Sequence, residues 1–327
     1  MRLPSLPAFR PDPFLLTITA AVILATVLPV RGAAVRPTEI GTDLAIAVLF
    51  FLHGAKLSRQ AIIAGLGAWR IHIAVLCATF VLFPLLGLGT RYLADQWLNP
   101  GIGAGILLLC LMPSTVQSSI AFTAVARGNV PAAVCSAAAS NILGVVLTPL
   151  LVALFFAQTT GGISWAAATK IGTQLLLPFI LGHFCRPLML PLLDRWKSLL
   201  ARFDRGVIVL VVYVAFSAAV MEGLWARYSL ADLAWTFALD AVILAAALLV
   251  TTFAARALKF SKPDEIVIVF CGSKKSLASG VPIAGALFPS AVVGPMILPL
   301  MLFHQMQLMA CAILAQRYAQ RPADERT

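Results

Sequence analysis

Long apolar runs dominate the pattern of hydrophobic and polar positions in this chain. Stretches of roughly 20 mainly apolar residues recur from end to end, and a helix of about that length is needed to cross a hydrocarbon layer about 30 Å thick. A transmembrane β-barrel would show alternating segments of about ten residues instead. The pattern predicts an all-α polytopic membrane protein with ten spans, at about 14–31, 39–57, 71–93, 99–126, 130–156, 166–188, 205–223, 233–257, 264–288 and 290–316.

Composition supports this class. Apolar residues make up 61% of the 327 residues and charged residues 11%, whereas an ordinary soluble domain carries about 25% charged residues. The six cysteines lie inside or at the ends of the predicted spans and form no Cys-x-x-Cys pair, so we interpret them as small packing residues. No disulfide framework and no metal site is predicted from them.

The positions of lysine and arginine predict the orientation. With the N-terminus in the cytoplasm, 17 of the 24 lysines and arginines fall in cytoplasmic segments, 5 fall in outer segments and two lie inside a span. This excess follows the positive-inside rule, so we expect both termini and the basic loop 189–204 in the cytoplasm. The net charge of +11 then reflects topology and lipid headgroups, and nucleic-acid binding is not expected. Short loops without an N-x-S/T sequon fit a bacterial inner membrane.

The ten predicted spans divide into two sets of five with matching interruptions. The fourth span carries Met112-Pro-Ser-Thr-Val-Gln-Ser-Ser119 at its centre, and the ninth carries Gly272-Ser-Lys-Lys-Ser276 at the corresponding place. An odd number of spans inverts the second set in the membrane, so we predict two inverted repeats, residues 1–157 and 158–327. Paired broken helices in such repeats point to a transporter's binding site, and the two breaks are expected to meet.

Lys274 and Lys275 are the most informative residues of the chain. A charge at bilayer depth costs about 3 kcal/mol or more, and such a residue usually faces a cavity or a partner. A single serine in a span is more simply explained by helix–helix packing, but packing does not require a buried ammonium. The predicted substrate- or ion-binding site comprises the lysines and the polar residues near the breaks: Ser114, Thr115, Gln117, Ser118, Ser119, Asn141, Ser273, Lys274, Lys275, Ser276, His304 and Gln305.

Two stretches resemble a known family. Arg127-Gly-Asn-Val130 after the fourth span and the string Phe270-Cys-Gly-Ser-Lys-Lys-Ser-Leu-Ala-Ser-Gly-Val-Pro282 in the ninth are similar to the bile acid:sodium symporter superfamily. The longer string resembles the branch of the seventh mammalian sodium/bile acid cotransporter and its bacterial relatives. The resemblance implies a core domain of spans three to five and eight to ten, and a panel domain of spans one, two, six and seven. It also implies a substrate crevice between them and alternating access.

The chain departs from the sodium-coupled members at their ion ligands. The resemblance places a glutamate and a glutamine of those members at Phe270 and Lys274. It places hydroxyl residues of a first sodium site at Ala133 and Ala137, with Ser136 one position away. We therefore predict no cofactor, and sodium remains possible only without the family's ligands.

Two roles for the lysines remain open. A lysine ammonium carries one positive charge and three donors, so Lys274 could replace a sodium ion among its oxygens, and release of its proton could couple transport to a proton gradient. Alternatively, both lysines bind an anionic substrate directly. We expect Lys274 to lie against polar oxygens of the fourth and fifth spans, and Lys275 to face the crevice or His304 and Gln305.

The predicted function is secondary transport of a small organic, anionic solute by alternating access, independent of sodium. A sodium-coupled organic anion symporter and a regulatory membrane protein without flux remain alternatives. An enzyme is not expected, because the chain contains neither His-Glu-x-x-His nor Gly-x-Ser-x-Gly and no aspartate pair within its spans. The expected partners are a small-molecule substrate and the lipid bilayer.

Overall fold

The computed structural model describes residues 13–56, 65–97, 100–160 and 172–321, and within these ranges it is helical without a strand. Eight helical segments there are long and apolar enough to cross a membrane: Gly32–Lys56, Trp69–Tyr92, Val130–Phe156, Thr173–Arg195, Lys197–Met221, Leu230–Ala257, Lys262–Leu287 and Ser290–Ala319. Leu16–Val27 and Pro100–Leu111 are shorter apolar helices. The all-α class is confirmed, while the count of ten spans and the inverted repeats stay predictions.

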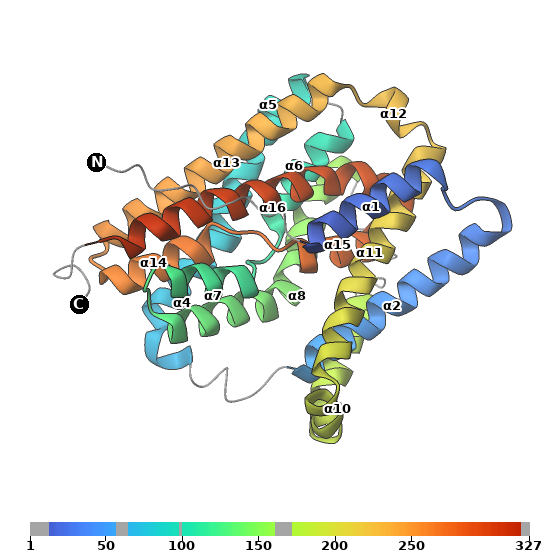
Figure 1. Ribbon diagram of the computed structural model, residues 1–327. Coiled ribbons are helices and arrows are strands. Elements are labelled where there is room, and N and C mark those ends of the chain that lie inside the picture. Colours follow the sequence, from blue (N-terminus) through green and yellow to red (C-terminus); the bar gives the residue numbers. More distant parts are fainter. Residues whose placement is uncertain (1–12, 57–64, 98–99, 161–171, 322–327) are drawn as a thin grey trace.

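Four helices lie together on one side of the molecule (Figure 1). α1 (Pro13–Val27) packs along α11 (Lys197–Met221), and α2 (Val35–Lys56), which follows the short turn η1 (Gly32–Ala34), packs along α10 (Leu177–Arg195) and α11. A π-helical turn, η4 (Gly172–Leu176), precedes α10. The predicted sixth span, 166–188, begins outside the described residues.

The closest approach in this group joins α2 to α10 through two glycines. A Cβ on Gly54 would overlap the carbonyl oxygen of Phe179, and a Cβ on Gly182 would overlap the carbonyl oxygen of Phe51. Small residues that let two backbones touch are typical of helix pairs in membranes, where apolar burial alone does not drive association. The glycine pair therefore sets the spacing of these two helices.

The remaining helices form the other side of the molecule and its centre (Figure 1). They are η2 (Gly65–Ala68), α4 (Trp69–Cys77), the π-helical turn η3 (Ala78–Leu82), α5 (Phe83–Trp97), α6 (Pro100–Leu111), α7 (Gln117–Val125), α8 (Val130–Thr160), α13 (Leu230–Ala257), α14 (Lys262–Gly272), α15 (Leu277–Leu287) and α16 (Ser290–Ala319). The short helix α12 (Leu224–Arg227) follows α11 and packs against it. α11 packs against both α15 and α16 and so joins the two groups.

Two of these segments are interrupted where sequence predicts interruptions. α6 ends at Leu111 and α7 begins at Gln117. α14 ends at Gly272 and α15 begins at Leu277, and the hydroxyl of the preceding residue Ser276 caps α15 by accepting from the Ser279 amide. Pro113 lacks the N–H that a continuous helix would need, and Gly272 is a poor helix former. The predicted breaks near 113–118 and 272–276 are therefore observed.

The predicted loop 189–204 is wrong. α10 continues to Arg195, and α11 begins at Lys197 after Trp196 alone. The predicted sixth span ends at position 188, but apolar residues continue to Leu193, and a helix can extend beyond the membrane edge that hydropathy marks. The polar continuation makes an exposed ion pair between Asp194 and Lys197 at 3.0 Å, with the i,i+3 spacing of a helix.

Candidate functional site

The two interruptions meet and are hydrogen-bonded to each other. The amide of Ser276 donates to the carbonyl oxygen of Pro113 at 2.9 Å. The hydroxyl of Ser114 donates to the carbonyl of Cys271 at 2.5 Å, and that of Ser119 donates to the carbonyl of Phe270 at 2.9 Å. The serines of one break thus satisfy carbonyl groups at the end of the other half-helix, which would otherwise be unpaired.

Lys275 is held as a bound cation would be. Its side chain is fully buried. Its ammonium donates to three main-chain carbonyl oxygens, those of Thr79 at 2.9 Å, Cys110 at 3.0 Å and Met112 at 2.7 Å. These oxygens come from the π-helical turn η3 and from the C-terminal end of α6, which carries the negative end of a helix dipole. Nζ also lies 4.0 Å from the ring centre of Phe83. All three donors of the ammonium are therefore used.

Gln307 fixes the main chain at Lys275. Its Oε1 accepts from the Lys275 amide at 2.8 Å, and its Nε2 donates to the Lys275 carbonyl at 2.9 Å. Nδ1 of His304 lies 2.9 Å from the same Nε2. α16 therefore clamps the unwound segment through a side chain that satisfies both backbone groups of one residue, as buried polar groups require.

Lys274 points elsewhere and is held by an aromatic ring. It is fully buried, and its Nζ lies 4.2 Å from the ring centre of Phe122. That nitrogen has no hydrogen-bond partner among the residues that the structure describes. The expectation that Lys274 lies against polar oxygens is therefore wrong, and so is the expected facing of Lys275 towards the crevice. Adjacent residues on an unwound segment do diverge, but Lys275 is the one that the oxygens surround.

A second polar group surrounds Asn141 on α8. Its amide nitrogen donates to the carbonyl of Ser114 at 2.7 Å, and its Oδ1 accepts from the hydroxyl of Ser279 at 2.8 Å. Asn141 thus bridges the two breaks from α8. On the α7 side, the hydroxyl of Thr115 lies 2.9 Å from that of Ser118 and 3.0 Å from that of Ser119.

A cavity of about 480 Å³ lies between these polar groups and the helices of the first group. That volume falls within the range of small-molecule sites. Its polar wall includes Thr115, Gln117, Ser118, Asn141, Ser276, Ser279 and His304, and its apolar wall includes Phe14, Leu49, Phe50, Phe179, Ile208 and Ile283. The cavity therefore presents hydrogen-bonding groups on one side and an apolar surface on the other.

Charged side chains line one end of the cavity. Lys56 and Asp204 form an ion pair at 2.6 Å, and His53 lies beside them. Arg205 also lines this end, with its guanidinium 5.9 Å from the ring centre of Phe14. Since Lys56 and Asp204 neutralise each other, Arg205 supplies the surplus positive charge at this end.

The structure brings most of the predicted site residues together, in two layers. Thr115, Gln117, Ser118, Asn141, Ser276 and His304 line the cavity. Ser114, Ser119, Ser273, Lys274 and Lys275 are buried behind it. Gln305 does neither, and its Oε1 has no hydrogen-bond partner in the described part of the chain. The predicted set of site residues omits Thr79 and Gln307. Gln307 is a polar residue in an apolar helix and belongs by sequence to the same polar cluster as His304 and Gln305, whereas Thr79 gave no signal.

The positions that the resemblance assigns to sodium ligands are filled differently. Phe270 is fully buried, and its ring packs 6.0 Å from Phe122 and 6.1 Å from Tyr318, centre to centre. Ser136, on α8, lies 2.6 Å from Nδ1 of His72. An apolar ring thus occupies the position of the acid.

One acidic side chain is buried within α13. Asp240 is inaccessible to solvent, and neither of its carboxylate oxygens has a hydrogen-bond partner among the described residues. α13 packs against α5, α6 and η3, the elements that surround Lys275. An ionised carboxylate in such surroundings is costly.

Comparison with known proteins agrees with these features. The model of the SBF-like CPA transporter family matches residues 12–320. The chain is 57% identical over 321 residues to an uncharacterized protein of Pseudomonas aeruginosa, covering 98% of this chain and 96% of that one. It is 52% identical over 307 residues to the protein named "Putative symporter YfeH" of Escherichia coli, covering 94% and 92%. It is 26% identical over 311 residues to sodium/bile acid cotransporter 7 of Danio rerio, covering 93% of each.

These matches extend over nearly the whole chain, with its apolar helices and its crossed, interrupted segments. The protein is an integral membrane protein, and the relatives from Escherichia coli and Danio rerio carry the names of transporters. The chain therefore belongs to the SBF-like CPA transporter family.

Proposed function

We propose that the chain is a secondary transporter that carries a small organic anion by alternating access without sodium, with Lys275 in place of a sodium ion. One observation carries this proposal: a lysine ammonium has three carbonyl oxygens around it where two interrupted helices cross. Half-helix ends and unwound carbonyls coordinate the coupling cation in transporters of this kind. Here a tethered cation uses such oxygens, so the crossing is stabilised without an ion from solution.

The same geometry argues against a sodium ion at this place. A second positive charge a few Å from the ammonium would be repelled strongly in a low-dielectric site. Phe270 adds no oxygen ligand. Lys274, in contrast, has an aromatic face and no hydrogen-bond acceptor within the described residues, so its ammonium is the less stabilised of the two. We assign proton exchange to Lys274, which would couple transport to a proton gradient.

The cavity supports an anionic substrate with an apolar body. Arg205 lies at one end and offers a guanidinium that suits a carboxylate, sulfonate or phosphate. Asn141, Ser276 and His304 offer hydrogen bonds on the core side. Phe50 and Phe179 offer aromatic surface on the opposite side.

Alternating access would move two groups of helices against each other. We assign α1, α2, α10 and α11 to a panel domain, and α4–α8 with α13–α16 to a core domain. Each of two inverted repeats, residues 1–157 and 158–327, would contribute helices to both domains. A smaller cavity of about 200 Å³, lined by Glu39, Thr42, Asp43 and the loop at Pro289, lies between α2, α11 and the α15–α16 connection. At Gly285, which lines it, an added Cβ would lie 2.9 Å from Val211 and 3.3 Å from Ile46. This close contact would form one gate.

We further propose a bacterial inner membrane and cytoplasmic termini. In this orientation Trp196, between α10 and α11, faces the cytoplasm together with Arg195 and Lys197. A cysteine introduced at Trp196 in a chain without its six native cysteines would react with an impermeant maleimide only after cell lysis. Labelling in intact cells would indicate the opposite orientation, with Trp196 outside the cell.

Flux measurements test the proposal. The purified chain, reconstituted in liposomes, is offered a library of small organic anions while sodium and pH gradients are imposed separately. We expect at least one anion to accumulate in sodium-free buffer when a proton gradient is present. Empty liposomes and the Lys275→Met variant are the controls.

Two outcomes would overturn it. Flux that strictly requires sodium and ignores pH would indicate a sodium-coupled symporter. No flux of any library member, with a folded and correctly inserted protein, would favour a regulatory role.

A further inference from the structure

A groove between α13 and α16 lies outside the proposed transport cavity. It has a volume of about 440 Å³, and its apolar walls include Leu249, Phe253, Ala310 and Ile313. Phe253 is 78% exposed and Leu249 70% exposed. In a membrane protein, large exposed apolar side chains along a helix face lipid. Figure 1 shows α13 and α16 running side by side.

The groove has a polar end formed by two arginines. Arg256 and Arg317 lie at the C-terminal ends of α13 and α16. From Leu249 to Arg256 the helix rises about 10 Å, so the apolar part of the groove leads directly to its cationic end. Thr252 is a polar residue of the groove wall. Its hydroxyl donates to the carbonyl of Leu248 on its own helix at 2.7 Å, so this donor is not offered to the groove.

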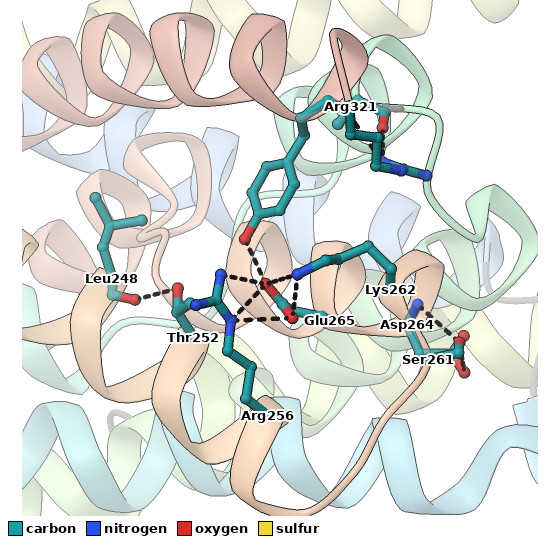
Figure 2. A network of polar contacts seen from close by, with 10 residues as sticks. Leu248, Thr252, Arg256, Ser261, Lys262, Asp264, Glu265 and Arg321 are labelled. Atoms are coloured by element: carbon teal, nitrogen blue, oxygen red, sulfur yellow. Dashed lines mark hydrogen bonds and ion pairs between the residues drawn. The ribbon is translucent and has the colours of Figure 1, made fainter. Parts of the chain in front are cut away.

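Glu265 holds Arg256 in place and leaves most of its side chain exposed. The guanidinium of Arg256 donates to the Glu265 carboxylate through Nε and Nη2 at 3.2 to 3.3 Å, and its side chain remains 60% exposed. Figure 2 shows Glu265 between Arg256 and Lys262, whose ammonium donates to it at 3.0 and 3.2 Å. Tyr318 donates to the same carboxylate at 2.8 Å. Arg256 is thereby pre-oriented at the mouth of the groove.

The charges at this end do not balance. Among the residues that the structure describes, Arg256, Lys262 and Arg317 are cationic and Glu265 pairs with the first two of them, so these four side chains carry a net charge of +2. Arg317 forms no ion pair within the described residues and is exposed. An arginine without an ion pair at the end of an apolar groove suits an anion that also carries an apolar chain.

We propose that this groove binds an anionic phospholipid, with an acyl chain between α13 and α16 and the phosphate against Arg256 and Arg317. Basic pockets between transmembrane helices are suited to such headgroups. Leu248 and Leu314, which line the groove, pack on the buried cluster that contains Phe270, and Phe122 packs on the same cluster. The lipid would therefore sit on the layer that covers Lys274. This inference does not rest on the proposed transport function.

Native mass spectrometry of the purified full-length chain tests it, with dioleoyl phosphatidylglycerol and dioleoyl phosphatidylcholine as probes. We expect phosphatidylglycerol to be retained preferentially. Arg317→Gln and Arg256→Gln should each lower its retention roughly fivefold, since each arginine near the headgroup contributes about 1 kcal/mol. Arg202→Gln, an exposed arginine on α11 away from the groove, is the matched control and should have no effect.

A substitution that fills the groove distinguishes the contribution of the acyl chain from that of the headgroup. Ala310→Phe should displace the lipid while keeping both arginines, whereas Met309→Phe, at a neighbouring exposed position that does not line the groove, should not. Glycerol 3-phosphate, which has no acyl chain, should not compete. Equal retention of both lipids, an equal loss in Arg202→Gln, or full retention in Ala310→Phe would each overturn the proposal.

Discussion

The amide of Ser276 and the carbonyl oxygen of Pro113 are joined by a hydrogen bond of 2.9 Å, although 163 positions separate these residues in the sequence. The bond ties the break after α6 to the break after α14. Lys275 directly precedes Ser276, so its ammonium enters the carbonyl end of α6 from a fixed point. The crossing is one structural unit in which the backbone of each half-helix completes the other.

Removal of the Lys275 ammonium should create a cation site. In Lys275→Ala, the carbonyls of Thr79, Cys110 and Met112 lose their donor, at a cost of about 1–3 kcal/mol for each group left unsatisfied. We expect a lower thermal unfolding temperature in choline chloride and recovery in sodium chloride. Lys275→Met fills the space and should not recover, and the wild type should not respond. A Lys275→Ala variant that is as stable as the wild type in choline chloride would contradict the role of a tethered cation.

Glu265, in the first turn of α14, should be more sensitive to neutralisation than an exposed acid. Its side chain is 3% exposed and accepts from Arg256, Lys262 and Tyr318. Glu265→Gln keeps the shape but weakens three charge-assisted contacts, so we expect a loss of about 2 kcal/mol in unfolding free energy. The matched control is Asp194→Asn, which breaks an exposed pair with Lys197 and should cost almost nothing. Similar losses in thermal unfolding for both variants would refute this ranking.

The crossing shows how far sequence alone reaches. The interruptions were predictable because Pro113 and Gly272 break helices and because polar residues gather at the same place in two long apolar runs. The exchange of roles between Lys274 and Lys275 was not, because the direction of a side chain on an unwound segment depends on its tertiary neighbours. All three acceptors of the Lys275 ammonium, in Thr79, Cys110 and Met112, are main-chain oxygens, which leave no trace in side-chain chemistry.

The buried carboxyl of Asp240 should be dispensable for folding. Neither oxygen has a hydrogen-bond partner in the described part of the chain, and an ionised group there would be costly. Asp240→Asn keeps its shape and cannot ionise, so the unfolding temperature should be unchanged or higher. Thermal unfolding of the reconstituted or detergent-solubilised protein measures this. A marked loss of stability would indicate that the carboxylate is ionised and paired in the native protein.

The packing of α2 on α10 should tolerate no side chain at its two glycines. Gly54→Val and Gly182→Val would place methyl groups where Phe179 and Phe51 carbonyls lie. We expect a strong loss of monodisperse protein in size-exclusion chromatography. Gly41→Val, on the same helix α2 but with open space around it, is the control and should be recovered at nearly wild-type yield. Recovery of all three variants would mean that the helices separate at little cost.

Lys274 should be needed for coupling and not for folding. Its ammonium lies over Phe122 and gains no hydrogen bond from the described residues, so Lys274→Met, which keeps the apolar stem, should fold with an unchanged or higher unfolding temperature. Flux driven by a proton gradient should be lost. Lys274→Arg should also lose it, because a guanidinium does not release its proton. Proton-driven flux at the wild-type rate in both variants would assign coupling to another group, and unfolding of Lys274→Met would make the contact with Phe122 structural.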